Sequence, residues 1–408
     1  MLAISDSGLK HSALIWQMDK GKKMSTSMSS SMESDMDAAC AVSKVQSDSG
    51  AGADTDSSKR TVFLDSERFS VAPMVDVTDS VFRRMARIMC HKAMLYTEMI
   101  AAQALVHEKY HLIDFRDEEL PCTLQLGGSE PQALALATRV GAQRGYSAIN
   151  LNAGCPSDKV QSGNFGAVLM KTPALIAQCW QAMQEAAGDI PVSVKTRIGV
   201  DELDSEDFTM ELMGTIYEAG CRHIIVHARK AWLTGLSPKE NRTVPPLDYE
   251  RVFKIKNTFD GLKVTINGGI TTIEQCRDLL GLVDGVMLGR AIIDNPYLLT
   301  RVDSDIFGAD TGTAELTREV IVEKMVHLGE QLAAEGRAVH FLYRHLLGLY
   351  NGCPNSRLYR RYLSENMNLK GASPSVLAHA VKAMQRAGGT SCLSGADTVT
   401  TPADCGCS

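Results

Sequence analysis

Short apolar segments alternate with amphipathic stretches along residues 69–292, and the two kinds of segment differ in period. The apolar or β-branched segments span residues 69–74, 93–99, 122–127, 148–152, 192–198, 223–227, 263–266 and 285–288. Between them, apolar residues recur at helical spacing, as in residues 80–90, 131–144, 174–187, 206–219 and 272–280. Strict alternation of strand and helix is typical of parallel β/α units, so the pattern predicts an α/β fold, a closed (β/α)8 TIM barrel. An open doubly wound sheet is the alternative, and the absence of a GxGxxG turn after the first segment weakens it.

From residue 314 onward the pattern indicates helices alone. Helical periodicity covers residues 314–334, 338–351, 355–365 and 373–387, which predicts an all-helical domain after the barrel. The charge changes at nearly the same place. Residues 61–334 hold 27 Lys and Arg against 36 Asp and Glu, whereas residues 335–390 hold 8 against 2. The net charge of the whole chain is −6, so the local positive excess fits a small surface that contacts phosphates.

Composition sets the remaining boundaries. We expect a disordered, low-complexity extension over residues 1–60, the barrel over 61–312, the helical domain over 313–390 and a disordered tail over 391–408. The chain has no apolar run of the roughly 18 residues that a membrane span needs, and its eleven cysteines form no CxxC pair. We therefore expect a monomeric cytoplasmic protein with reduced thiols, no membrane span and no bound metal. Acidic residues in the extension disfavour a mitochondrial transit peptide.

The most informative run is residues 150–157, Asn-Leu-Asn-Ala-Gly-Cys-Pro-Ser, at the end of the fourth predicted strand. Asn150 and Asn152 share one face of this strand, and two amides in a core strand are costly unless they are hydrogen-bonded. Cys155 lies between a glycine and a proline, in a loop that must be stiff and sharply turned. Because α/β barrels carry their chemistry at the strand ends, we predict a functional Cys155; a structural buried cysteine is the alternative.

Polar side chains also occupy one face of the neighbouring predicted strands. Gln125, Lys195 and His227 each lie on the face that is expected to point into the barrel. A lysine in the middle of a strand is rarely buried without an anionic partner. Lys195 is therefore expected either in an internal salt bridge or beside an electron-rich cofactor ring, whose negative charge its ammonium group would stabilise.

Glycine-containing turns follow the last two predicted strands. Gly268 and Gly269 come after Asn267, and Gly289 is followed by Arg290. Backbone N–H groups near glycines can approach a phosphate closely, and barrels frequently bind phosphate between these two loops. We therefore expect a phosphorylated cofactor here. The Ala-Pro-Met run that ends the first strand is apolar and rigid enough to lie against a flat ring.

With these positions in place, the sequence resembles the tRNA-dihydrouridine synthases, most closely the A-type bacterial branch. The resemblance covers roughly residues 67–387. The runs that carry it are APM (72–74), LYTEM (95–99), LQLGG (124–128), NLNAGCPS (150–157), VKTR (194–197), HARKAWLTGLSPKEN (227–241), INGGI (266–270), GR (289–290) and RRYLSEN (360–366). The GCPS and HARKAWL runs are far more specific than a glycine motif alone.

The resemblance implies FMN as cofactor, NADPH as reductant and tRNA as substrate, with reduction of the C5=C6 bond of D-loop uridines at positions 20 and 20a. Hydride would pass from reduced FMN to C6, and Cys155 would give a proton to C5, because an ordinary thiol is mostly protonated at neutral pH. The FMN contacts that it implies are Pro73, Met74, Val75, Gln125, Lys195, His227, Asn267, Gly268, Gly269, Gly289 and Arg290. The tRNA contacts that it implies are Asn152, at the uracil edge, and Lys239, Arg242, Arg357 and Arg360, at the backbone.

Two other functions would use many of the same residues. A flavin-dependent reductase of small pyrimidines or enones would keep the fold and the cofactor, but a free base needs no phosphate-binding surface, so the basic helical domain disfavours it. A non-catalytic RNA-binding protein could use the scaffold as a tRNA chaperone, and the presence of Cys155, Lys195 and His227 argues against this.

Overall fold

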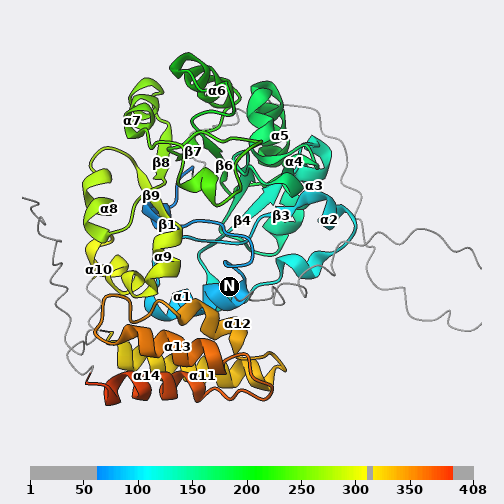
Figure 1. The fold of residues 1–408 in the computed structure, drawn as a ribbon. Helices are drawn as coiled ribbons and strands as arrows, with labels where there is room; N and C mark the ends of the chain where they lie inside the picture. Colours follow the sequence, from blue (N-terminus) through cyan, green and yellow to red (C-terminus); the bar gives the residue numbers. More distant parts are fainter. Residues whose placement is uncertain (1–61, 310–315, 389–408) are drawn as a thin grey trace, which may run out of the picture. The chain divides into compact units, whose positions relative to one another are not determined.

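One parallel sheet forms a barrel in the computed structural model, which describes residues 62–309 and 316–388 (Figure 1). Its strands are β1 (Phe69–Val71), β2 (Leu95–Tyr96), β3 (Ile100–Ala101), β4 (Cys122–Gly127), β5 (Ala148–Asn152), β6 (Val192–Arg197), β7 (His223–His227), β8 (Lys263–Asn267) and β9 (Gly285–Leu288). Their order is β1-β9-β8-β7-β6-β5-β4-β2, and β3 also pairs with β4. A parallel bridge between Ser70 and Met94 joins β1 to the residue before β2. The predicted (β/α)8 barrel is confirmed, and the open sheet was the wrong alternative.

The second barrel position is divided between β2 and β3. Leu95 pairs with Cys122, and Ile100 pairs with Leu126, so both short strands run along the same edge of β4. Between them, Thr97 Oγ1 accepts the N–H of Gln125 at 3.0 Å. A side-chain oxygen thus replaces a backbone acceptor where the ladder is interrupted, and the backbone N–H of Gln125 is paired.

Helices cover the outside of the barrel between successive strands. They are α1 (Ser80–Met89), α2 (Ala102–Val106), α3 (Pro131–Gln143), α4 (Asp158–Gln161), α5 (Pro173–Ala186), α6 (Glu206–Glu218), α7 (Tyr249–Thr258), α8 (Ile273–Leu279), α9 (Arg290–Asp294) and α10 (Val302–Asp305). The 3-10 helices are η2 (Asp65–Arg68), η3 (Tyr110–Ile113), η4 (Asp117–Glu119), η5 (Gly166–Lys171), η6 (Glu240–Arg242), η7 (Pro296–Arg301) and η8 (Arg344–Leu346). In the part of the chain that the structure describes, no helix has the length and apolar character needed to cross a membrane.

Local sequence explains where the long helices begin. The side chains of Asp79, Ser205, Asp248 and Thr272 each accept a backbone N–H from the first turn of α1, α6, α7 and α8, respectively. These are the residue types that satisfy the unpaired N–H groups of a helix start. Helices α3 and α5 instead begin with a proline, which has no N–H to satisfy at that position.

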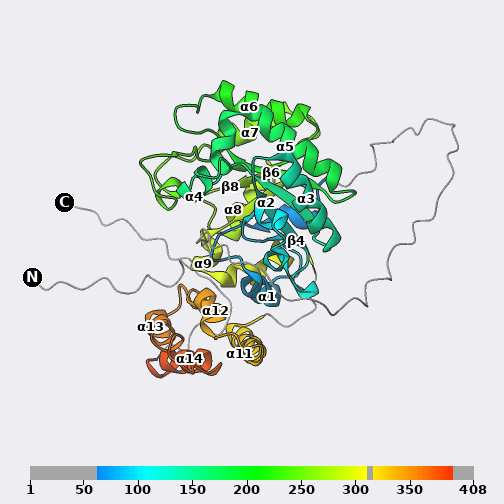
Figure 2. The same cartoon turned by 90° about the vertical axis from the view of Figure 1, so that its right-hand side faces the viewer.

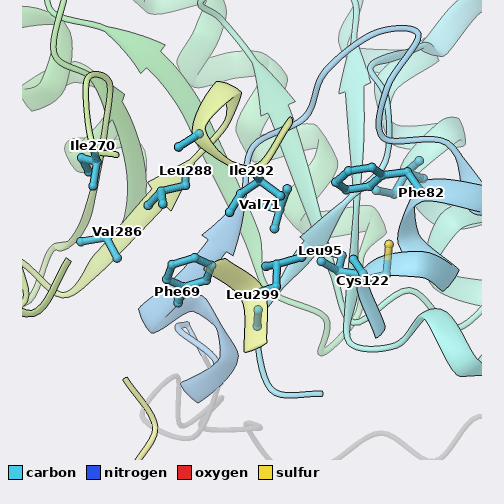
Figure 3. Close-up of a cluster of buried hydrophobic side chains, with 14 of the residues drawn as sticks. Phe69, Val71, Phe82, Leu95, Cys122, Ile270, Val286, Leu288, Ile292 and Leu299 are labelled. Carbon is cyan, nitrogen blue, oxygen red and sulfur yellow. The ribbon is translucent and has the colours of Figure 1, made fainter. Parts of the chain in front are cut away.

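The barrel separates two buried regions of different character. Outside the sheet, a continuous apolar core fills the space under the helices, and Figure 3 shows part of it around Phe69, Val71 and Leu288. The inside of the barrel, here called the lumen, has only a small apolar cluster that includes Tyr96 and Met287. The other buried side chains of the lumen are polar: Ser70, Thr123, Gln125, Asn150, Asn152, Ser193, His223, Thr265 and Asn267.

Four further helices follow the barrel, and α11, α13 and α14 lie side by side (Figure 2). They are α11 (Arg318–Ala334), α12 (His340–Tyr343), α13 (Ser356–Asn366) and α14 (Val376–Arg386). The predicted helix over residues 338–351 is wrong in its length, because α12 ends at Tyr343 and the chain continues as η8. At this break, Arg344 reaches Asp79 at the start of α1, with a distance of 2.9 Å between the charged atoms. The regular α-helix ends here, and the residue that follows contacts the barrel.

Residues 1–61, 310–315 and 389–408 lie outside the described part of the chain. The predicted extension and tail fall there, as does the first part of the predicted helix over residues 314–334. The proposed boundaries of the four regions therefore stay predictions.

The packing at Gly285, the first residue of β9, gives a test of how closely the barrel is packed at the amino ends of its strands. A Cβ at this position would lie 2.5 Å from the carbonyl oxygen of Glu67 and 2.6 Å from Thr265 Oγ1. Gly285→Ala should therefore lower the free energy of unfolding by about 1–3 kcal/mol, as overpacking does. Gly214→Ala in α6 is the matched control, because its Cβ would meet only Phe259, at 3.6 Å. Urea unfolding of both variants checks this, and equal stabilities would contradict the close approach.

Candidate functional site

The carboxyl ends of the strands bring most of the predicted site residues to one mouth of the barrel. The register pairs Asn152 of β5 with Lys195 of β6, and Arg197 of β6 with His227 of β7, which in turn pairs with Asn267 of β8. Because parallel strands end at the same side of a sheet, residues far apart in sequence share one level at this mouth.

The loop of residues 153–157, here called the Cys155 loop, is held by backbone hydrogen bonds. Asn152 Oδ1 accepts the N–H groups of Gly154 at 3.1 Å and Cys155 at 3.0 Å. From the next strand, Arg197 Nε donates to the carbonyl oxygen of Gly154 at 2.9 Å. The Cys155 thiol itself is partly exposed, with its Sγ 3.5 Å from Ser157 Oγ. The loop is thus fixed while its thiol stays accessible. A buried cysteine with only a structural role would not need this combination.

Lys195 lies in the lumen without the salt bridge that was considered for it. Its Nζ donates to Asn267 Oδ1 at 3.1 Å, and no carboxylate in the described residues lies within ion-pair distance. Burial, reinforced by the nearby charges of Arg197 and Arg242, lowers the pKa of Lys195 to about 7. A buried ammonium group that lacks a counterion is stabilised by an anionic ligand.

His227 has a ring nitrogen that the protein does not satisfy. Its Nδ1 is buried and has no hydrogen-bond partner among the described residues. Burial, reinforced by the charges of Arg197 and Lys195, holds the pKa of His227 well below its usual range, so the ring is neutral. A buried polar atom without a partner fits a site that is completed by a bound molecule.

The glycine turns after β8 and β9 leave room beside this ring. Gly268 has a φ of 114° and Gly269 a φ of 74°, which side chains rarely adopt. A Cβ on Gly268 would lie 3.2 Å from His227 Nε2, and one on Gly269 would lie 2.4 Å from Leu247 Cδ1. Close approach to the backbone is therefore possible only because both residues are glycines. Helix α9 after Gly289 has five residues, so its dipole adds little to the site.

An apolar surface lies next to these turns at the end of β1. A Cβ on Gly289 would lie 3.5 Å from both Ala72 Cβ and Met74 Sδ, as expected for neighbouring strands β1 and β9. Beyond Pro73, the side chain of Val75 is 58% exposed. The predicted ring-contacting residues of the first strand are thus adjacent to the predicted phosphate-binding turn.

Five arginine and lysine residues lie at the mouth, and none of them forms an ion pair with a carboxylate of the described residues. Arg290 donates to the carbonyl oxygen of Arg242 at 2.7 Å, and repulsion between these two guanidinium groups adds to burial in lowering the pKa of Arg242. Burial also lowers the pKa of Arg229, and again Arg290 contributes. Together with Lys195 and Arg197, these residues make the mouth a strongly positive region, which attracts anions.

The basic residues predicted to bind tRNA lie in two regions of the structure. Lys239 precedes η6 on the loop after β7 and Arg242 is the last residue of η6, and both are exposed. Arg357 and Arg360 are exposed on α13, whereas Tyr359 between them is buried and anchors the helix. No ion pair involves Arg357 or Arg360 within the described ranges, but Arg361 pairs with Glu365 at 3.0 Å. Asn152 differs from the others, since its amide already bonds to Gln125 and to the Cys155 loop.

Arg197 is the residue that sequence reasoning left out of the site. It is buried and donates only to backbone carbonyls, those of Gly154, Lys230 and Asn241 among them. It therefore joins the Cys155 loop to the loop after β7. The sequence signal was its position two residues after Lys195 on the same strand face, but the carbonyls that it binds could not be known without the structure.

Within the described ranges, no group of three or more His, Cys, Asp or Glu residues is arranged to hold a metal ion. The groups that can act chemically at the site are its thiol, its cations and its unsatisfied polar atoms.

Comparison with known proteins gives a consistent match across the barrel and the following helices. The family model described as Dihydrouridine synthase (Dus) matches residues 70–386. The tRNA-dihydrouridine(20/20a) synthase of Shewanella oneidensis is 47% identical over 317 residues, which cover 78% of this chain and 94% of that protein. Proteins with the same description from Pasteurella multocida and a Synechocystis species are each 48% identical, over 77% and 79% of this chain and 95% and 97% of their own lengths.

Proposed function

The chain belongs to the dihydrouridine synthase family, and we propose that it uses FMN as cofactor and NADPH as reductant. It is a tRNA-dihydrouridine synthase, a flavin-dependent oxidoreductase that forms dihydrouridine at positions 20 and 20a of the D-loop. The observation that carries the proposal for its site is the meeting of an accessible thiol, an unpaired lysine and an unsatisfied histidine at one barrel mouth.

The residues present fit FMN on three counts. The unpartnered Nδ1 of His227 offers a hydrogen bond to a polar ring. The positive-φ pair Gly268 and Gly269 allows a phosphate to reach the backbone, and Arg290 adds charge beside it. Pro73, Met74 and Val75 would contact the ring from the side of β1, with Gln125 and Asn267 on neighbouring strands. When bound, FMN would supply the hydride that saturates C6 of uracil.

Lys195 would stabilise the negative charge that reduction places on the flavin. Its ammonium group is half-buried and hydrogen-bonded only to Asn267 among the described residues, so it can turn toward an anionic ring without breaking an ion pair. In a water-poor lumen such an interaction is much stronger than in bulk water.

Cys155 would donate the proton that C5 of uracil needs. The thiol is held by a rigid loop and remains partly exposed, so a base can reach it and solvent can return the proton after turnover. A uridine must leave its stack to enter the mouth of a barrel, which RNA-modifying enzymes achieve by flipping the base. One N–H of the Asn152 amide remains for a uracil carbonyl, because the other donates to Gln125.

Exposed basic residues, at the rim of the mouth and on α13, would hold the tRNA body. Lys239 and Arg242 lie on the loop after β7, and Arg357 and Arg360 are exposed on α13 without carboxylate partners in the described chain. Phosphate contacts position a nucleic acid without reading its sequence. These residues would therefore decide which D-loop uridine reaches Cys155.

The pKa of Lys195 leads to a test of the flavin site. Because this lysine titrates near pH 7 in the flavin-free protein, binding of reduced, anionic FMN above pH 7 must take up a proton. Its affinity should then fall by up to about tenfold per pH unit between pH 7 and 9. Lys195→Met should remove this slope. Lys263→Met should keep it, because Lys263 is the first residue of β8 and lies at the opposite end of that strand from Asn267. Anaerobic fluorescence titration measures the affinities, and equal slopes for wild type and Lys195→Met would contradict the assignment.

Replacement of the thiol tests the proposed acid. Cys155→Ala should retain flavin and its reduction by NADPH, while dihydrouridine formation falls by roughly 10²–10⁴-fold, the loss typical of a missing general acid. Cys179→Ala removes a buried thiol of α5 in the outer core and serves as the control. Mass spectrometry of unmodified tRNA after reaction gives the yield. Near-normal turnover by Cys155→Ala would leave this thiol without a catalytic role.

The salt dependence of tRNA binding distinguishes residues that contact tRNA phosphates from residues that act in the reaction. Each lost phosphate contact should reduce the salt slope of tRNA binding by about one, so Arg357→Ala with Arg360→Ala should reduce it by about two. Reduction of the flavin by NADPH should not change. Arg361→Ala is the control on the same helix, because its charge is already paired with Glu365. If the double variant binds tRNA like wild type across a salt series, α13 does not contact phosphates.

A further inference from the structure

The backbone of residues 154–156 in the Cys155 loop is fully hydrogen-bonded. The carbonyl oxygen of Cys155 accepts the N–H of Ala167 at 2.9 Å. The carbonyl oxygen of Pro156 accepts Gln161 Nε2 at 2.8 Å. With the bonds from β5 and β6 described above, every backbone N–H and C=O of these three residues has a partner. The position of the thiol is therefore set by the groups that bind the backbone on either side of it.

The amide of Gln161 also binds the loop after β7. Gln161 is the last residue of α4, and its Nε2 donates to the carbonyl oxygen of Leu233 at 2.7 Å as well as to Pro156. A side-chain amide nitrogen carries two N–H groups, so both donors are used. One half-buried side chain thus holds the Cys155 loop and the loop after β7 together.

The loop after β7 is itself organised by Asn241. This side chain is fully buried; its Oδ1 accepts the N–H of Trp232 at 2.7 Å, and its Nδ2 donates to the carbonyl oxygen of Trp232 at 2.9 Å. The two ends of the segment 232–241 are therefore closed on each other. Leu233, which Gln161 binds, lies within this segment, and the proposed tRNA contacts Lys239 and Arg242 lie within it or next to it.

Gln161 differs from Arg197, the other residue that contacts both loops. Arg197 belongs to β6, so its bonds attach each loop to a strand of the barrel. Gln161 instead follows the Cys155 loop directly in the chain, because α4 begins at Asp158. Its bond to Leu233 therefore joins the two loops to each other, with no strand between them.

We infer that Gln161 is a positioning residue that couples the loop after β7 to the Cys155 loop. The placement of the thiol then depends on the loop that carries Lys239 and Arg242. The inference rests on the proposed function for the role of Cys155 as an acid and of the other loop in tRNA binding, whereas the hydrogen bonds hold whatever the reaction is. A tRNA backbone held by the loop after β7 would thus be held in register with the acid.

Reactivity of the Cys155 thiol in flavin-free protein tests this link without the enzyme's activity. Gln161→Leu keeps a side chain of similar size and removes both N–H donors. It should raise the rate at which iodoacetamide alkylates Cys155 by about two- to tenfold, the factor that corresponds to one lost hydrogen bond. The rate is read from the Cys155 peptide by mass spectrometry, so other thiols do not contribute.

Ser162→Ala is the matched control, because it removes a side-chain hydrogen bond of the next residue that stays within the same short helix. Ser162 Oγ donates to the carbonyl oxygen of Lys159 at 3.0 Å and reaches neither loop. Its alkylation rate should equal that of wild type. The inference is overturned if Gln161→Leu reacts like wild type, or if Ser162→Ala accelerates alkylation as much as Gln161→Leu does.

A double-mutant cycle tests whether the link transmits changes between the loops. Asn241→Ala releases the segment 232–241 and should accelerate alkylation of Cys155 in the wild-type background. In the Gln161→Leu background it should add little, because the connection is already lost. Single effects that multiply in the double variant would show that the two loops act independently, and would overturn the coupling.

Steady-state kinetics of the FMN-loaded enzyme give a second measurement. Gln161→Leu should lower kcat for dihydrouridine formation by about two- to tenfold, while KM for tRNA and the rate of flavin reduction by NADPH stay at wild-type values, as expected when a group used only in the transition state is misplaced. A general loss of structure would change all three, and that result would overturn the inference. If the alkylation rates follow the inference but the wild-type protein forms no dihydrouridine, the link between the loops stands and only the proposed function fails.

Discussion

A barrel with a polar lumen must satisfy the hydrogen bonds of that lumen from within, and the arrangement of the site depends on this constraint. An unpaired buried amide costs about 1–3 kcal/mol, so Gln125, Asn150 and Asn152 would be a liability if they were not matched. The register of β4, β5 and β6 places each of them opposite a partner. Fully matched networks are rigid, and this rigidity reaches the mouth because Asn152 also binds the Cys155 loop.

Accumulated positive charge at the same mouth is a second constraint, and it lowers the stability of the folded protein. Lys195, Arg197, Arg229, Arg242 and Arg290 accumulate positive charge. Burial lowers the pKa of four of them, and repulsion from the neighbouring cations lowers it in the same direction. Like charges held together in a partly buried site raise the free energy of the folded protein. Binding of a phosphorylated, anionic cofactor relieves the repulsion, and any ligand that binds only the folded state stabilises it by mass action. The mouth proposed to bind the flavin is thus a part of the fold that an anionic ligand would stabilise.

The C-terminal helices meet the barrel through charged and polar contacts. Arg84 of α1 donates to Gln331 of α11 at 3.2 Å, and Arg344 of η8 pairs with Asp79 at the start of α1. Of the arginines in the C-terminal helices, Arg344 is thus turned toward the barrel, while Arg357 on α13 remains exposed. The positive excess that the sequence shows for residues 335–390 therefore has two different roles, and only the exposed part is available to a nucleic acid.

The sequence by itself determined the order of strands and helices, because side-chain period reports directly on local structure. It also indicated Cys155, Lys195 and the glycine turns, since these residue types at strand ends have few structural uses. Only the tertiary structure decided that Lys195 has no salt bridge in the described chain, that Arg197 ties two loops together, and that Asn152, Gln125 and Asn150 are linked in series by hydrogen bonds. The predicted helix over residues 338–351 is wrong in its length, and the residue that follows its end at Tyr343, Arg344, pairs with Asp79, 265 residues earlier in the chain. Periodicity is a local property, whereas the partner of a buried charge or amide is supplied by another strand or helix, and no local pattern names that partner.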